Sequence, residues 1–180
     1  SEEKYFEILD KRLELAEKAL LLRYNLLKDV VSDVSPIHWQ HGAIARLKKG
    51  EKISRFLSGG YATISLGYIG IYEATRLITG ESNTGEKGRV FAMKIMDRLN
   101  DAINLWHDKH NLGFGLYGTP AESLTNRFSS LDRARFGVIE DITDKGYYTN
   151  SYHVNVREEI NVFDKFAFES EFQKKSTGGC

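Results

Sequence analysis

The chain has only one cysteine and two prolines among its 180 residues. The single thiol, Cys180, cannot form an internal disulfide, which excludes a disulfide-stapled fold and leads us to expect a reducing, cytoplasmic environment. Neither charge is in excess, because 25 basic residues balance 25 acidic ones. The sequence therefore lacks the charge imbalance that is typical of proteins that bind nucleic acid or acidic membranes, and we expect neither partner.

Long hydrophobic runs are also missing. No apolar stretch approaches the roughly 18 residues that a membrane span requires, and no signal peptide opens the sequence. The chain is nevertheless 41% hydrophobic and 12% aromatic, which is sufficient for the core of one domain. The Gly178-Gly179 pair before Cys180 is typical of a turn leading into further chain, although a frayed terminus gives the same pattern.

The first third of the chain has two parts. Residues 1–33 are predicted to form one long helix, because apolar residues recur at three- and four-residue spacing from Tyr5 to Val31. A helix covering a core explains this pattern better than a helix used only for interaction. Residues 34–60 are polar and irregular. His38 and His41 lie here, but no acid or cysteine follows at a familiar ligand spacing, and we expect no metal site.

Residues 61–136 are predicted to form strand–helix units. Residues 61–69 are apolar and β-branched as in a buried strand, and a short helix follows over residues 71–79. An amphipathic helix over residues 89–110 leads directly into a second strand at residues 112–116. Strands separated by helices favour parallel pairing with right-handed crossovers, and hence an α/β fold. So few strands cannot close a barrel alone, which indicates a single segment of a larger catalytic domain.

The turn after the second strand is the strongest candidate site. Thr119 is a preferred N-cap, Pro120 suits the first helical position, and Glu122 three residues after the cap completes a capping box. A strand that passes through glycine into a capped helix can bind an anion with its free N–H groups. The candidate phosphate-binding residues are Gly118, Thr119, Ala121, Glu122 and Ser123. On spacing alone, an ordinary strand-to-helix turn without a ligand is the simpler interpretation.

Residues 137–180 differ in character. Residues 147–156, YYTNSYHVNV, alternate as a strand would, and residues 161–172 are predicted to form an aromatic loop packed on a core. His153 is a candidate substrate-side contact or base. A histidine satisfied within a polar strand face is the simpler alternative, because the local sequence shows no adjacent acid or nucleophile.

Four stretches together resemble a known family: SLGYIGIYEATRLITG (65–80), FGLYGTPAESLTNRF (114–128), DKGYYTNSYHVNV (144–156) and the closing FDKFAFESEFQKKSTGG. In this order they resemble the carboxyl-terminal half of the catalytic barrel of the anaerobic (class III) ribonucleoside-triphosphate reductases. The resemblance covers nearly the whole chain. GTPAES followed by YYTNS-x-H-V is its most specific element.

The resemblance implies a partial β/α barrel with long amphipathic helices, a fragment of the ten-stranded barrel of a glycyl-radical enzyme. It implies conversion of ribonucleoside triphosphates to 2′-deoxyribonucleoside triphosphates by glycyl and thiyl radicals. In the whole family the cofactors and partners are a glycyl radical, zinc, ATP and dNTP effectors, formate as reductant, an iron–sulfur/S-adenosylmethionine activase and a second copy of the chain. It also favours a substrate-phosphate role for residues 118–123.

The sequence departs from the family pattern at the radical machinery. The thiyl cysteine, the glycyl-radical motif and the paired CxxC zinc motifs have no counterpart here, and Cys180 does not match the radical cysteine. We therefore expect this chain to hold no catalytic residue and to be inactive alone. A non-catalytic nucleotide- or partner-binding module derived from the same barrel is the alternative, and an unrelated β/α phosphate-binding protein is a third interpretation. Base specificity is not encoded in these motifs.

Overall fold

The structure is a computed structural model that describes residues 1–43 and 45–179, apart from the side chain of Glu122. Cys180 therefore lies outside the described residues. The chain divides into two compact units. The first, the sheet unit, comprises residues 1–2, 65–101 and the described residues from 115 onward. The second, the α1 unit, comprises residues 3–64 and 102–114.

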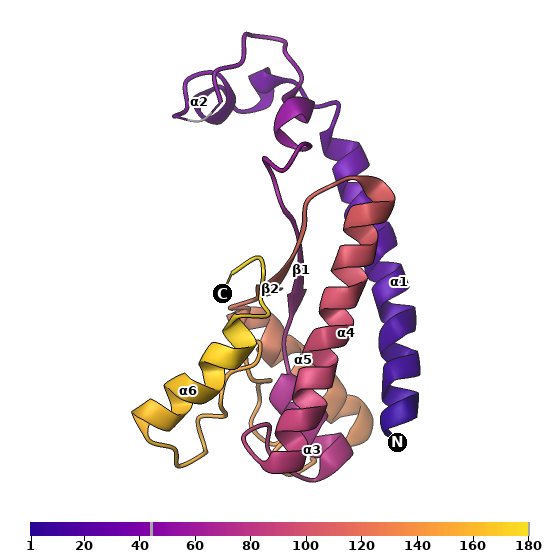
Figure 1. The fold of residues 1–180 in the computed structure, drawn as a ribbon, viewed down its shortest axis with the longest axis vertical. Coiled ribbons are helices and arrows are strands. Elements are labelled where there is room, and N and C mark those ends of the chain that lie inside the picture. Colours follow the sequence, from indigo (N-terminus) through magenta and orange to yellow (C-terminus); the bar gives the residue numbers. More distant parts are fainter. Residues whose placement is uncertain (44, 180) are drawn as a thin grey trace. The chain divides into compact units, whose positions relative to one another are not determined.

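The α1 unit contains most of α1 (Glu2–Leu27) and the last turns of α4 (Glu86–His110), which lie side by side (Figure 1). Glu17 on α1 joins them, because it accepts hydrogen bonds from His110 Nε2 at 2.7 Å and Lys109 Nζ at 2.9 Å. The bond from His110, aided by Lys109, holds the pKa of Glu17 below its usual value. The buried apolar side chains of this unit are Leu13, Ala45, Leu47, Ile53, Ile103, Trp106 and Leu112.

The helix α1 ends at Leu27, four residues before the predicted Val31, which instead forms an antiparallel bridge with Lys52. The segment that follows is largely irregular, as predicted, and holds three short turns of helix: η1 (Ser32–Val34), α2 (Pro36–Trp39) and η2 (Ile53–Phe56). Among the described residues, no group of three His, Cys, Asp or Glu side chains could hold a metal ion. The same residues contain no helix that is long and apolar enough to cross a membrane.

The strands β1 (Ile64–Tyr68) and β2 (Phe114–Gly118) pair in parallel as a two-stranded sheet, and all but the first residue of each belongs to the sheet unit. The helix α3 (Ile71–Thr79) follows β1 with the bounds that the sequence predicts. Gly70 and Gly80 flank it with φ of 78° and 77°, a left-handed conformation that suits glycine. The helix α4 begins three residues before the predicted position 89 and buries Phe91, Ala92, Ile95, Met96 and Leu99.

Two predictions for the last part of the chain are wrong. Residues 147–156 form turns, with only an isolated antiparallel bridge from Ile69 to Asn150, instead of a strand. Residues 161–172 form a helix, α6 (Val162–Gln173), instead of an aromatic loop. The side chain of Asn161 caps this helix by accepting hydrogen bonds from the N–H groups of Phe163 and Asp164, both at 3.0 Å. The core of the sheet unit accordingly includes Phe168 and Phe172 of α6.

Candidate functional site

The predicted phosphate-binding residues lie together where β2 ends and α5 (Glu122–Phe136) begins. Gly118 closes β2, and its N–H donates to Gly179 O at 3.0 Å. Ala121 is the residue before the helix, and Ser123 is exposed in its first turn. Because α5 is 15 residues long, the positive end of its dipole falls at this turn. The turn can therefore present backbone N–H groups and two hydroxyls to an anion.

The predicted capping of α5 is wrong. Ala121, not Thr119, is the N-cap residue, Pro120 precedes the helix, and no side chain of the N-cap residue makes a capping bond. Thr119 Oγ1 instead turns back toward Tyr117 O at 3.3 Å. The capping box also needs the side chain of Glu122, which lies outside the described part of the chain. The acceptor for the Ala121 N–H comes from a distant residue: it is Asn150 Oδ1, at 3.2 Å.

Asn150 belongs to a segment that we call the strap, residues 144–158. The middle of the strap crosses the carboxyl end of β1. Thr149 O accepts the N–H of Gly70 at 2.8 Å, and Ser151 O accepts the N–H of Ile71 at 3.3 Å. Two backbone carbonyls of the strap thus bind the start of α3, although the sequence predicts a strand there. Asn150 lies between the ends of β1 and β2, because it forms a bridge with Ile69 and accepts the Ala121 N–H.

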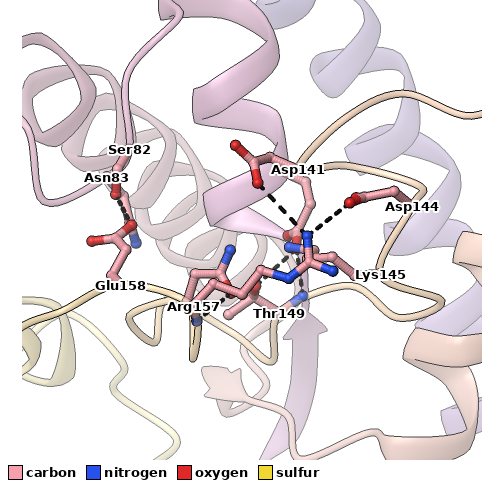
Figure 2. Close-up of polar contacts among 10 residues, drawn as sticks. Ser82, Asn83, Asp141, Asp144, Lys145, Thr149, Arg157 and Glu158 are labelled. Atoms are coloured by element: carbon pink, nitrogen blue, oxygen red, sulfur yellow. Dashed lines mark hydrogen bonds and ion pairs between the residues drawn. The ribbon is translucent and has the colours of Figure 1, made fainter.

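The two ends of the strap are fixed by charged side chains (Figure 2). Arg157 Nη1 lies 2.7 Å from Asp144 Oδ2 and 3.8 Å from Asp141 Oδ1. These ion pairs join the end of the strap to its beginning. The bond from Arg157 holds the pKa of Asp144 below its usual value. Glu158 accepts hydrogen bonds from Thr84 Oγ1 at 2.7 Å and from the hydroxyl of Ser82. The strap is thus tied both to itself and to the turn between α3 and α4.

His153 lies on the strap and has the acidic neighbour that the local sequence did not reveal. Its Nδ1 lies 3.2 Å from Glu169 Oε1 on α6. The same oxygen accepts the N–H of Val154 at 3.1 Å. The His153 side chain is 43% exposed, so its ring is accessible from a neighbouring space. A carboxylate at Nδ1 orients an imidazole and favours the tautomer that leaves Nε2 as an acceptor.

A cavity of about 500 Å³ adjoins this histidine. Its wall includes side chains of the strap, α5 and α6, among them Thr125, Tyr148, Asn150, His153, Lys165 and Glu169. Burial raises the pKa of Tyr148, and its hydrogen bond to Asp132 Oδ2 at 2.6 Å raises it further. Tyr148 is therefore a neutral phenol at physiological pH. The cavity brings polar groups from the strap next to the first turns of α5.

Sequence reasoning missed Glu73, Lys145, Asn150 and Glu169 as parts of this arrangement. Asn150 stands in the motif YYTNS, so its position was visible but not its partner. Glu73 and Glu169 are paired with residues that lie 72 and 16 positions away. Only a structure or an alignment of covarying positions reveals such pairs.

Comparison with known proteins shows which family the chain is similar to. The family model for anaerobic ribonucleoside-triphosphate reductase matches residues 1–180. The chain is 42% identical to the anaerobic ribonucleoside-triphosphate reductase of Salmonella typhimurium over 178 residues, which are 97% of this chain and 25% of the relative. The reductase of bacteriophage T4 is 38% identical over 180 residues, 99% of this chain and 28% of the relative. The chain therefore spans about a quarter of the length of these curated relatives.

Solved structures give the same fold. The anaerobic ribonucleotide reductase of Thermotoga maritima with citrate in its active site superposes with a TM-score of 0.73 at 22% identity, over all of this chain and 31% of that one. Its complex with dATP and CTP gives a TM-score of 0.71, over 99% of this chain and 28% of that one. The fold is thus the predicted partial segment of that α/β barrel. The match of the family model over residues 1–180, together with these sequence identities, shows that the chain belongs to the anaerobic ribonucleoside-triphosphate reductase family.

Proposed function

We propose that the protein that contains this chain reduces ribonucleoside triphosphates to 2′-deoxyribonucleoside triphosphates by glycyl and thiyl radical chemistry. This segment contributes contacts to the substrate phosphates at the turn between β2 and α5. The donors are the backbone N–H groups of Thr119, Ala121, Glu122 and Ser123, with the hydroxyls of Thr119 and Ser123. The N–H of Gly118 is not among these donors, because it is already bound to Gly179 O.

One observation supports this site above others. The acceptor on the Ala121 N–H is a neutral amide oxygen at 3.2 Å, which is at the long end of the range for such bonds. A phosphate oxygen carries charge and is a stronger acceptor, with hydrogen bonds about twice as strong as neutral ones. A phosphate oxygen can therefore share this donor with Asn150 Oδ1, which keeps the N–H oriented, and it gains the helix dipole as well.

The groups that perform the radical chemistry are proposed to reside in other parts of the protein. Protein zinc sites use three or four Cys, His, Asp or Glu side chains, and the described residues offer no cluster of three such side chains. We therefore assign no step of this segment to zinc or to an iron–sulfur group. Formate, the ATP and dNTP effectors, the activase, a homodimer partner and a cytoplasmic location stay proposals for the whole protein. His153 is proposed as a substrate-side contact that Glu169 orients.

The test is steady-state kinetics of the full-length, activated reductase with Ser123→Ala and Thr119→Ala. Losing a hydroxyl that binds a charged phosphate costs about 1.5–3 kcal/mol, which corresponds to a KM increase of about tenfold or more. The matched control is Ser130→Ala, an exposed serine in the second half of the same helix. Its KM should equal that of the native enzyme.

Unchanged KM values for both variants would remove the phosphate role from this turn. Binding of the triphosphate without any turnover by the full-length, activated protein would instead favour a non-catalytic module derived from the same barrel.

A further inference from the structure

The buried carboxylate of Glu73 binds two residues of the strap, Lys145 and Thr149, which are labelled in Figure 2. Glu73 is on the first turn of α3, and its Oε1 atom accepts hydrogen bonds from Lys145 Nζ at 2.5 Å, from Thr149 N at 2.8 Å and from Thr149 Oγ1 at 2.8 Å. The side chain of Lys145 is completely buried and that of Glu73 is 4% exposed. One carboxylate oxygen therefore fixes two residues of the strap, four positions apart.

Stability alone is a poor explanation for this pair. Removing two charges from water carries a large free-energy cost, and well-packed apolar residues often replace a buried ion pair without loss of stability. The second carboxylate oxygen, Oε2, is buried and has no hydrogen-bond partner among the described residues, which adds to that cost. Lys145 Nζ also lies 4.5 Å from the centre of the Tyr72 ring, so its position is strictly defined. Such an arrangement favours fixed geometry over net stability.

The contacts of Glu73 with Thr149 fix the position of the following residue, Asn150. Thr149 is bound to Glu73 through its N–H and its hydroxyl, and its own carbonyl accepts the N–H of Gly70 at 2.8 Å. Asn150 follows directly, and its Oδ1 receives the Ala121 N–H at the start of α5. A continuous chain of contacts thus runs from α3, through the strap, to the turn between β2 and α5.

We propose that Glu73 is a positioning residue of the phosphate site. Through Lys145 and Thr149 it holds Asn150 against the Ala121 N–H, so that the donors of the turn are already oriented when a triphosphate arrives. This inference rests on the proposed phosphate role of that turn. Glu73 does not touch the substrate, and its effect passes through Asn150.

Two measurements on the full-length reductase test it. Glu73→Gln keeps the size of the side chain but removes its charge, and Asn150→Ala removes the acceptor from the Ala121 N–H. Hydrogen exchange of the peptide that spans residues 119–125 reports on that N–H without any ligand. Both variants should exchange faster there, and both should raise KM for the ribonucleoside triphosphate about tenfold, with kcat within about twofold of native.

The double variant decides whether the two residues act together. If Glu73 acts through Asn150, Glu73→Gln/Asn150→Ala should have the same KM as Asn150→Ala alone, because the second change has nothing further to remove. If the KM increase of the double variant equals the product of the two single increases, Glu73 acts by another route and the inference is overturned. The matched control is Glu140→Gln, which makes the same chemical change on an exposed side chain of the sheet unit. Its hydrogen exchange and its KM should equal those of the native enzyme.

A milder variant covers the case in which Glu73→Gln does not fold, since it leaves Lys145 buried without a counter-ion. Thr149→Val removes only the hydroxyl that reaches Glu73 and should change exchange and KM in the same direction by a smaller factor. If Glu73→Gln, or Thr149→Val in its place, leaves exchange native while Asn150→Ala raises KM, the inference fails and the phosphate role stands. If exchange rises but no variant, including Ser123→Ala, changes KM, the phosphate role itself fails.

Discussion

Thr119 follows directly after β2, and its hydroxyl oxygen occupies space that is open because residue 67 is a glycine. A Cβ built on Gly67 would lie 2.2 Å from Thr119 Oγ1 and 3.5 Å from Thr119 Cβ. The first distance is a collision and the second an ordinary contact. The position of the Thr119 hydroxyl at the candidate site thus depends on the absence of a side chain on the neighbouring strand.

Gly67→Ala should therefore lower the free energy of unfolding by about 1–3 kcal/mol, the usual cost of overpacking. Thr119→Ala in the same chain removes the colliding oxygen, so the double variant should be more stable than Gly67→Ala alone. Denaturant unfolding of the native protein, both single variants and the double variant measures this. Additive losses would show that the hydroxyl is not the group that limits position 67.

The pair of Asp144 and Arg157 makes the strap sensitive to acid. The bond from Arg157 lowers the pKa of Asp144 in the folded protein, while the unfolded value is about 3.9. A carboxyl with a lowered folded pKa stabilises the fold fully above its unfolded pKa, and this contribution is lost as pH falls through the folded pKa. Asp144→Asn should thus lower the melting temperature at pH 7, and the difference from native should shrink below about pH 4.

Melting curves of the native protein and Asp144→Asn between pH 7 and pH 3 measure this difference. Arg157→Gln should show the same pH window, since it removes the other member of the pair. A difference from native that stays constant down to pH 3 would mean that Asp144 acts through its shape and not its charge.

At the scale of elements, local signals predict some parts of the chain well. The helix α3 has its predicted bounds because left-handed glycines flank it at both ends. Alternating polar and aromatic residues predict a strand over residues 147–156, yet the backbone groups of this segment bind separate partners. The Tyr148 N–H, for example, donates to the Thr125 carbonyl. Alternation reports which side chains are buried, and a turn-rich segment that crosses strand ends produces the same alternation as a sheet.

The helix α6 lacks a clear helical pattern in its sequence. Phe168 and Phe172, four residues apart, are buried, but Phe163 and Phe166 are 80% and 65% exposed. Aromatic residues on both faces hide the helical period. In the candidate site, the positions of residues 118–123 were predictable from the glycine and the turn, whereas the Asn150 cap was not, because it comes from 29 positions away.

The cap of α6 gives a prediction at this scale. Asn161→Ala removes the acceptor for the Phe163 and Asp164 N–H groups and should cost about 1 kcal/mol of stability. Asn161→Ser is the matched control, since it keeps a side-chain oxygen at the cap and should lose much less. Thermal melts compare the three proteins. Equal melting temperatures for native and Asn161→Ala would show that water satisfies these N–H groups equally well.

At the scale of the whole molecule, the described chain exposes apolar faces that a complete core would cover. Val162, Phe163 and Phe166 form one such face on α6, with exposed fractions of 53%, 80% and 65%. Leu124, Phe128 and Leu131 form another on α5. Because the curated relatives are about four times as long, we infer that further chain covers these faces in the full-length protein.

The isolated 180-residue chain should consequently self-associate, since soluble monomers rarely expose adjoining apolar side chains of this size. Sedimentation velocity at increasing concentration measures the association. The double variant Phe163→Ser/Phe166→Ser should stay monomeric to higher concentration, whereas Val156→Ser, which changes a singly exposed apolar residue on the strap, should behave like the native chain. A monomeric native chain at every concentration would contradict the inference.

The pairing of residues 177–179 with β2 has a consequence for biosynthesis. Gly178 N–H donates to Leu116 O at 2.8 Å, and the Gly118 N–H donates to Gly179 O at 3.0 Å. In a strand the backbone N–H and C=O groups of successive residues point to opposite edges. Gly113 O accepts the N–H of Ile64 at β1, so Leu116 and Gly118 bind residues 178–179 at the other edge of β2. Ribosomes add about 5–20 residues per second, so the partner of Leu116 emerges several seconds after β2 does. During that interval the nascent chain has an open strand edge, which another chain could pair with.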